Sequence, residues 1–141
     1  SDPITFDESV DFNAYLKHEL THLFEAVKHY KPTELVGSSG AFDSVVDMIA
    51  GEFSTEALND NHTEYCIDLN HYAFISKKIK ESTIKERYHI TGLIDMRVDM
   101  IVISVLLIDF ILKELHLHKM RVSTFSLKEG VISKKLGLSL Y

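Results

Sequence analysis

Cysteine, proline and tryptophan are scarce in this chain, whose 141 residues include one cysteine, two prolines and no tryptophan. Because Cys66 has no second cysteine to pair with, the cysteine content does not indicate an oxidising compartment, and we expect a cytoplasmic location. The prolines are Pro3 and Pro32, and no repeat or Pro/Gly/Ser-rich linker interrupts the sequence. We therefore expect residues 1–141 to form a single folded unit.

Positive charge and long apolar runs are also in short supply. The 15 Lys and Arg residues against 21 Asp and Glu residues give a formal net charge of −6, which provides no electrostatic footprint for wrapping nucleic acid or an anionic membrane. The longest apolar run, residues 100–112, is interrupted by Ser104 and Asp109 and is shorter than the ~18 to 20 residues that cross a bilayer. We expect neither nucleic acid nor a membrane as a partner, whereas a homo-oligomer is left open.

The spacing of apolar residues predicts a helix-rich α/β fold. Apolar residues recur every three or four positions over five predicted helices, and short apolar segments predict two or three strands, each followed by a helix. The predicted helices cover residues 11–30, 42–49, 70–81, 95–115 and 127–136, with helical turns at 83–88, and the predicted strands cover 34–36, 65–67 and 121–123. Strands that alternate with helices in this way are typical of a parallel arrangement. The helix over 95–115 is apolar on nearly every face in its second half, which predicts that it is buried.

The first candidate motif is His18-Glu19-x-x-His22, which matches the H-E-x-x-H pattern of zinc peptidases. In those enzymes two imidazoles one helical turn apart bind the metal and the glutamate polarises the attacking water. Here both histidines lie roughly opposite the apolar stripe of their predicted helix, so they face solvent. A third histidine ten residues after His18 is missing, because that position is Lys28. A solvated helix face is therefore the interpretation that we favour, with a zinc peptidase kept as an alternative.

The second candidate is the turn Gly37-Ser38-Ser39-Gly40, between a predicted strand and a predicted helix. Glycines let the backbone approach a ligand, and successive N–H groups at a helix N-terminus can bind an anion. A tight turn with Ser39 capping the helix explains the same residues without a ligand. Asp43 in the first helical turn opposes a phosphate, so an anion bound here needs shielding or a bridging metal.

A third stretch, residues 86–101, combines charged side chains with a helix boundary. Gly92 interrupts the chain before the long helix, Asp95 can cap that helix, and Arg97 and Asp99 lie in its first turns. Capping and ion pairing are the roles that the residues by themselves favour.

A fourth stretch, residues 122–131, predicts a strand that passes through a hydroxyl-rich turn into a helix. Glu129 lies in the first turn of that helix. Its carboxylate can reach a ligand, pair with Arg97 or bind a backbone amide, and the sequence leaves these alternatives open.

Taken together, the last three stretches resemble the exopolyphosphatase / guanosine pentaphosphate phosphatase (Ppx/GppA) family, which belongs to the actin-like ATPase group with ribonuclease H-like domains. They are similar, in the same order, to the family's G-T-S-G-T loop, its E-R-x-x-I-x-G-L-x-x-x-R-A-D-x-I segment and its closing V-S-x-x-G-L-R-E-G segment. The matching residues are Gly37-Ser38-Ser39-Gly40; Glu86-Arg87, Ile90, Gly92-Leu93, Arg97-Val98-Asp99 and Ile101; and Val122-Ser123 with Leu127-Lys128-Glu129-Gly130. Three ordered motifs are more specific than any one of them.

The resemblance implies that residues 1–141 are the C-terminal portion of the second actin-like domain of such a phosphatase. The family's two phosphate-holding loops, D-x-G-S-N-S-like and D-I-G-G-G-S-like, have no counterpart here, nor has the catalytic glutamate of its first domain. Ala41 also stands where the family usually has threonine. We therefore expect no catalytic residue and no metal site in this chain. Its apolar helix would lack the strands that pack against it in a whole domain, so its surface is exposed, covered by other helices or buried in an oligomer.

For the intact enzyme, the resemblance implies hydrolysis of a terminal phosphoanhydride bond in polyphosphate or a guanosine polyphosphate, with Mg²⁺ as the cofactor. Gly37, Ser38, Ser39 and Gly40 would contact phosphate or nucleotide through backbone amides, and Arg97, Asp99 and Glu129 would brace that wall of the cleft. We expect the chain alone to be inactive. The alternatives are the zinc peptidase through His18, Glu19 and His22, and a non-catalytic interaction module.

Overall fold

The computed structural model describes residues 1–59 and 61–137 and confirms a helix-rich α/β fold. In chain order the elements are α1 (Phe6–Glu19), α2 (Thr21–Tyr30), β1 (Leu35–Ser38), α3 (Ala41–Phe53), β2 (Glu64–Ile67), α4 (Leu69–Glu81), α5 (Ile84–Arg87), the 3-10 helix η1 (Asp95–Arg97), α6 (Ile101–Glu114), β3 (Met120–Ser123) and α7 (Leu127–Leu136). Within these ranges no helix is both long and apolar enough to cross a membrane.

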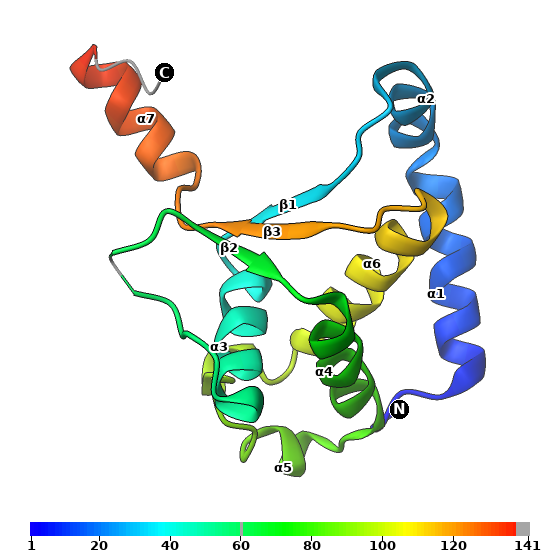
Figure 1. The fold of residues 1–141 in the computed structure, drawn as a ribbon. Helices are drawn as coiled ribbons and strands as arrows, with labels where there is room; N and C mark the ends of the chain where they lie inside the picture. Colours follow the sequence, from blue (N-terminus) through cyan, green and yellow to red (C-terminus); the bar gives the residue numbers. More distant parts are fainter. Residues whose placement is uncertain (60, 138–141) are drawn as a thin grey trace.

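The three strands form one mixed sheet in the order β1-β3-β2. β1 and β3 are parallel, with Gly37 opposite Val122, as the sequence predicts. The expectation of parallel strands is wrong for β2, which pairs with β3 in the antiparallel sense and places Cys66 opposite Arg121. The register shows why: Ser123 pairs with Ser38, the last residue of β1, and with Glu64, the first residue of β2 (Figure 1). β2 therefore enters the sheet from the end at which β1 leaves it.

Helices α3, α4 and α6 cover one face of the sheet, and α1 runs along the outer side of α6 (Figure 1). Side chains alternate along the strands, so that Met120 and Val122 of β3 point into the core while Arg121 between them points away. Among the most deeply buried core residues are Val45, Met48, Ile75, Ile79, Ile101 and Val105. The small sheet therefore has one face packed by helices.

Two long helices expected from the sequence are each divided. The helix predicted over residues 11–30 is split at Leu20 into α1 and α2. The helix predicted over residues 95–115 is split into η1 and α6, and the N-cap of α6 is Met100. Asp95 therefore starts the 3-10 helix and does not cap the long helix, which corrects that expectation. The split turns the segment between η1 and α6 into a compact turn.

The apolar helix α6 is buried on the sides that face α1 and α4, whereas the side chains of Ile103 and Leu107 are 40% and 39% exposed. Neighbouring helices thus cover most, but not all, of its surface. Asp109, which interrupts the apolar run, accepts hydrogen bonds from Tyr72 at 2.8 Å and Ser76 at 2.7 Å on α4. Burial, with the nearby carboxylate of Asp109, raises the pKa of Tyr72. The acidic residue within the apolar run of α6 is therefore hydrogen bonded to α4.

Candidate functional site

The glycine-rich turn lies where the sequence places it, between the end of β1 and the start of α3. Gly37 and Ser38 are the last residues of β1, and Gly40 is the N-cap of α3. Gly37 is required by packing, because a Cβ there would lie 2.1 Å from Cδ1 of Phe42. Ser39 has a positive φ of 59° and precedes the N-cap, so the expectation that Ser39 caps the helix is wrong. Ser38 and Ser39 are exposed, which leaves the turn accessible to a ligand.

Arg97 lies against this turn although the two are far apart in sequence. A Cβ on Gly40 would lie 3.3 Å from Nη1 of Arg97, so the guanidinium fills the space beside the glycine. Gly40 has φ 64° and ψ −126°, a backbone conformation that is open to glycine and strained for other residues. Arg97, one of the expected bracing residues, therefore lies at the turn. Its guanidinium is a group that can bind an anion there.

Asp43 occupies the first turn of α3 and interacts electrostatically with Arg97 and Lys128. Burial raises the pKa of Asp43, Arg97 acts to lower it, and Asp47 raises it further. The Gly40 amide and Lys128 also lower it, but the net direction is upward. The position of Asp43 in the first turn of α3 is as predicted, and an anion bound at this helix N-terminus would meet its carboxylate.

Glu129 caps α7 and lies near the same site. Its carboxylate accepts hydrogen bonds from the backbone N–H and the hydroxyl of Ser126, each at 2.7 Å. These hydrogen bonds lower the pKa of Glu129 to about 2, with the hydroxyl of Ser126 as the largest cause. Of the three alternatives open in the sequence, the backbone amide is therefore the partner that is present. Glu129, Lys128 and Asp43 also line a depression of about 400 Å³.

Asp99 belongs to a different part of the surface. It lines a depression of about 440 Å³ together with Asp2, Glu8 and Arg87. Arg97, two residues earlier, turns to Gly40 instead. Of the three bracing residues expected from the sequence, Arg97 lies at the turn, Glu129 caps α7 and shares a depression with Asp43, and Asp99 lines the other depression.

The two histidines of the H-E-x-x-H pattern lie on separate helices. His18 belongs to α1 and is hydrogen bonded to Glu19 at 3.0 Å, and His22 belongs to α2. Both are exposed, in agreement with the predicted solvent-facing side. Over residues 1–59 and 61–137 no group of three or more His, Cys, Asp or Glu residues is arranged to hold a metal ion.

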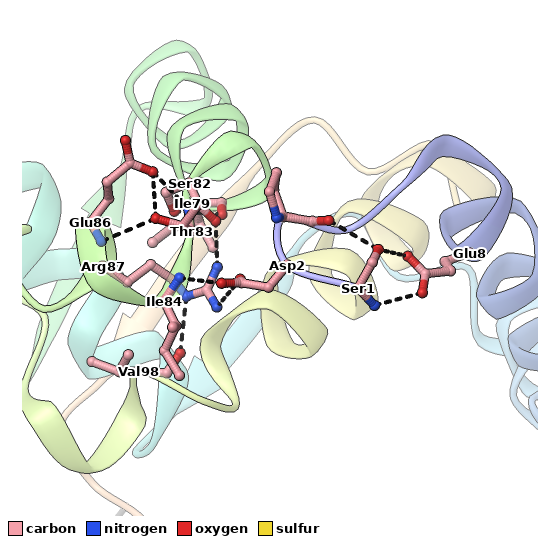
Figure 2. A network of polar contacts seen from close by, with 11 residues as sticks. Ser1, Asp2, Glu8, Ile79, Ser82, Thr83, Ile84, Glu86, Arg87 and Val98 are labelled. Atoms are coloured by element: carbon pink, nitrogen blue, oxygen red, sulfur yellow. Dashed lines mark hydrogen bonds and ion pairs between the residues drawn. The ribbon is translucent and has the colours of Figure 1, made fainter.

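Arg87 is a residue whose position the sequence did not reveal. It is 4% exposed, and its guanidinium binds Asp2 at 2.7 Å, across 85 residues of sequence. Figure 2 shows this side chain between the N-terminal segment, the start of α5 and Val98. The Glu86-Arg87 pair of the family motif was the available signal, but a pair of residue types does not indicate which distant groups it contacts.

Comparisons with known proteins agree with this fold. The profile of the Ppx/GppA phosphatase family matches residues 1–139. An exopolyphosphatase from Cytophaga hutchinsonii superposes with a TM-score of 0.90 at 32% identity, over 99% of this chain and 45% of that protein. A Ppx/GppA family member from Aquifex aeolicus superposes with a TM-score of 0.74 at 22% identity, over 96% of this chain and 42% of that protein, which shows the shared fold.

The chain thus spans less than half the length of these structural relatives. Among curated proteins, none matches it. The family profile nevertheless covers nearly all of the chain, and the superpositions extend over the same elements that form the glycine-rich turn and its Arg97 contact. This chain belongs to the Ppx/GppA phosphatase family.

Proposed function

We propose that residues 1–141 are the C-terminal portion of the second actin-like domain of a cytoplasmic phosphatase. The intact protein would release terminal phosphate from polyphosphate or guanosine pentaphosphate. The observation that carries this proposal is the contact between Arg97 and Gly40, at a strand-to-helix turn that is accessible to a ligand. Because the chain belongs to a phosphatase family, phosphate is the ligand that we assign to this turn.

The turn supplies donors for phosphate oxygens. Gly37 is buried in β1 and the Gly40 N–H hydrogen bonds to Asp43, whereas Ser38 and Ser39 are exposed. The backbone amides of Ser38 and Ser39, together with the Arg97 guanidinium, would therefore hold the phosphate chain or the nucleotide in place. Donors fixed before the ligand arrives also stabilise the negative charge that spreads over a phosphoryl group during transfer. Asp43 works against this binding and makes the site selective for an anion whose charge is shielded.

Mg²⁺ is the cofactor that the family resemblance implies for the intact enzyme, where it would neutralise phosphate charge. Residues 1–59 and 61–137 contain no cluster of three or more carboxylate, imidazole or thiol groups that fits a metal ion. We therefore name no metal ligand among these residues. The catalytic groups belong to the rest of the protein, so we expect the chain alone to be inactive.

The test is phosphate release by the protein encoded by the full reading frame, with long-chain polyphosphate and guanosine pentaphosphate as substrates. We expect Arg97→Met to lower kcat/KM by roughly a hundredfold to a thousandfold, the range for losing one donor that stabilises transition-state charge. Lys85→Met is the matched control, because Lys85 is an exposed cation on α5, which lies at the ends of the helices remote from the sheet and from the turn in Figure 1. Equal activity of both variants would contradict the proposed site.

Phosphate release, partner binding and zinc content together separate the alternatives. An intact protein that releases no phosphate but binds a partner through this chain would be an interaction module. Release of phosphate by the purified 141-residue chain would overturn the expected inactivity. Zinc retained by the purified chain and lost in His22→Ala would support the peptidase, which the placement of His18 and His22 on separate helices does not favour.

A further inference from the structure

We propose that Arg87 is a positioning residue for the candidate site: it fixes the turn that carries Arg97, and through that turn it holds the Arg97 guanidinium against Gly40. The consequence for phosphate binding rests on the proposed function, whereas the effect on the position of Arg97 does not.

Arg87 uses all three nitrogens of its guanidinium. Nε donates to the carbonyl oxygen of Val98 at 3.2 Å, and Nη1 donates to the carbonyl oxygen of Ser82 at 2.6 Å. Nη2 donates to Oδ1 of Asp2 at 2.7 Å, and the side chain is buried (Figure 2). A planar fork that reaches three acceptors in fixed directions is a property of arginine and not of lysine. The cluster therefore depends on this residue type.

Val98 links Arg87 to Arg97, because it is hydrogen bonded to Arg87 and follows Arg97 in the chain. The Val98 side chain is fully buried, and its N–H donates to the carbonyl oxygen of Asp95 at 3.2 Å, which closes η1. Arg97 precedes Val98 directly, and its own N–H donates to Ile94 at 2.9 Å. Because Val98 is bonded directly to Arg97 and their Cα atoms are only about 3.8 Å apart, we expect a displacement of Val98 to move the base of the Arg97 side chain as well.

The other end of the same segment is fixed by Gly92. A Cβ on Gly92 would lie 2.3 Å from the backbone carbon and oxygen of Asp47, so the chain packs directly on α3 at this point. α3 is also the helix whose N-cap is Gly40. The segment that carries Arg97 is thus held at Gly92 by α3 and at Val98 by Arg87. Loss of the second attachment leaves the first in place, which predicts a displaced Arg97 in a folded protein.

Asp2 completes the cluster. Its carboxylate receives the Nη2 group of Arg87 and also accepts a hydrogen bond from the N–H of Ile84 at 2.6 Å. It neutralises the buried guanidinium and ties the segment before α1 to the same attachment. Asp2→Asn removes the charge but keeps an oxygen acceptor, so it weakens the cluster less than a change at Arg87.

The first experiment follows the position of Arg97 in the 141-residue chain, without a ligand. In ¹⁵N spectra recorded well below the unfolding temperature, we expect Arg87→Lys to shift or broaden the backbone amide of Gly40 and the Nε–H resonance of Arg97. Ile79→Val, a buried substitution on α4, is the control for general loss of stability. It should lower Tm and leave both resonances unchanged. Arg87→Lys spectra in which both resonances stay at their wild-type positions would overturn the proposal.

Asp2→Asn provides the test if Arg87→Lys does not fold. We expect smaller displacements of the same two resonances, and none of these displacements in Asp7→Asn, which removes an exposed carboxylate from the first turn of α1. Identical spectra for Asp2→Asn and Asp7→Asn around Gly40 would contradict the proposal.

A double-mutant cycle then measures the effect on binding, with tripolyphosphate as the probe. We expect Arg87→Lys and Arg97→Met each to weaken binding, the former by roughly threefold to tenfold, and the double variant to bind no more weakly than Arg97→Met alone. Additive losses would show that Arg87 acts independently of Arg97. Absence of tripolyphosphate binding by the wild-type chain would count against the proposed function, while the spectra would still decide the role of Arg87.

Discussion

The guanidinium of Arg97 fills the space beside Gly40 that a side chain at residue 40 would need. The two residues belong to different segments, one preceding α3 and the other within η1. Their contact places a positive charge beside the exposed backbone amides of the glycine-rich turn.

Gly40→Ala should destabilise the chain by about 1–3 kcal/mol, because alanine is strained at φ 64°, ψ −126° and its Cβ would press on Arg97. Gly137→Ala is the matched control: Gly137 also has a positive φ, but no atom of the described residues, 1–59 and 61–137, lies within 4 Å of its Cβ position. We expect a change of at most about 1 kcal/mol there. Urea denaturation measures both free energies of unfolding, and equal losses would show that Gly40 has no special contact.

Asp43→Asn should strengthen the binding of tripolyphosphate by roughly fivefold at pH 7 and low salt, because it removes a like charge of about 1 kcal/mol from the site. Asp7→Asn removes an acidic residue from the first turn of α1 and serves as the control for net charge. Isothermal titration calorimetry provides the affinities. The same affinity in both variants would indicate that the anion does not approach the N-terminus of α3.

Asp109→Ala should cost about 2–3 kcal/mol, because it leaves the buried hydroxyl of Ser76 and the ammonium of Lys80 without their acceptor. The comparison is Glu81→Ala, which removes an exposed ion pair with Lys77 at 3.9 Å and should cost no more than about 0.5 kcal/mol. Both values come from chemical denaturation. A small loss for Asp109→Ala would mean that water replaces its hydrogen bonds.

The cap of α7 should weaken in acid. The pKa of Glu129 is about 2 in the folded chain, below its usual value of 4.5, because the carboxylate accepts hydrogen bonds from Ser126. A lowered pKa means that the cap contributes fully above about pH 4.5, the usual value, and loses its contribution as the pH falls toward 2. The Ser126 amide resonance should therefore titrate with a midpoint near 2, and Glu129→Gln should abolish this titration. A midpoint near 4.5 would contradict the hydrogen-bonded cap.

Local signals in the sequence predicted most elements well. The helix expected over residues 127–136 matches α7, because Ser126 and Glu129 form a capping box that is visible as a short pattern. The division at Leu20 was not predicted, since the apolar spacing continues through it. The direction of β2 was also missed, because a short apolar segment predicts a strand without indicating which way it runs.

The candidate site was predicted in part. The turn from Gly37 to Gly40 could be located from its glycines and from the order of the motifs. Arg97 and Asp99 were assigned together, but the turn between η1 and α6 sends them to different surfaces. A pattern that gives only residue spacing cannot show this, because a compact turn changes the direction of neighbouring side chains.

The sequence by itself determined the helix-rich α/β class, the position of the glycine-rich turn and the family of the chain. These features depend on local spacing, on capping residues and on the order of short motifs. Only the tertiary structure decided that β2 is antiparallel, that Arg97 reaches Gly40 and that Arg87 binds Asp2 across 85 residues. Such contacts join segments that are distant along the chain, and they form only when the whole core packs and brings those segments together.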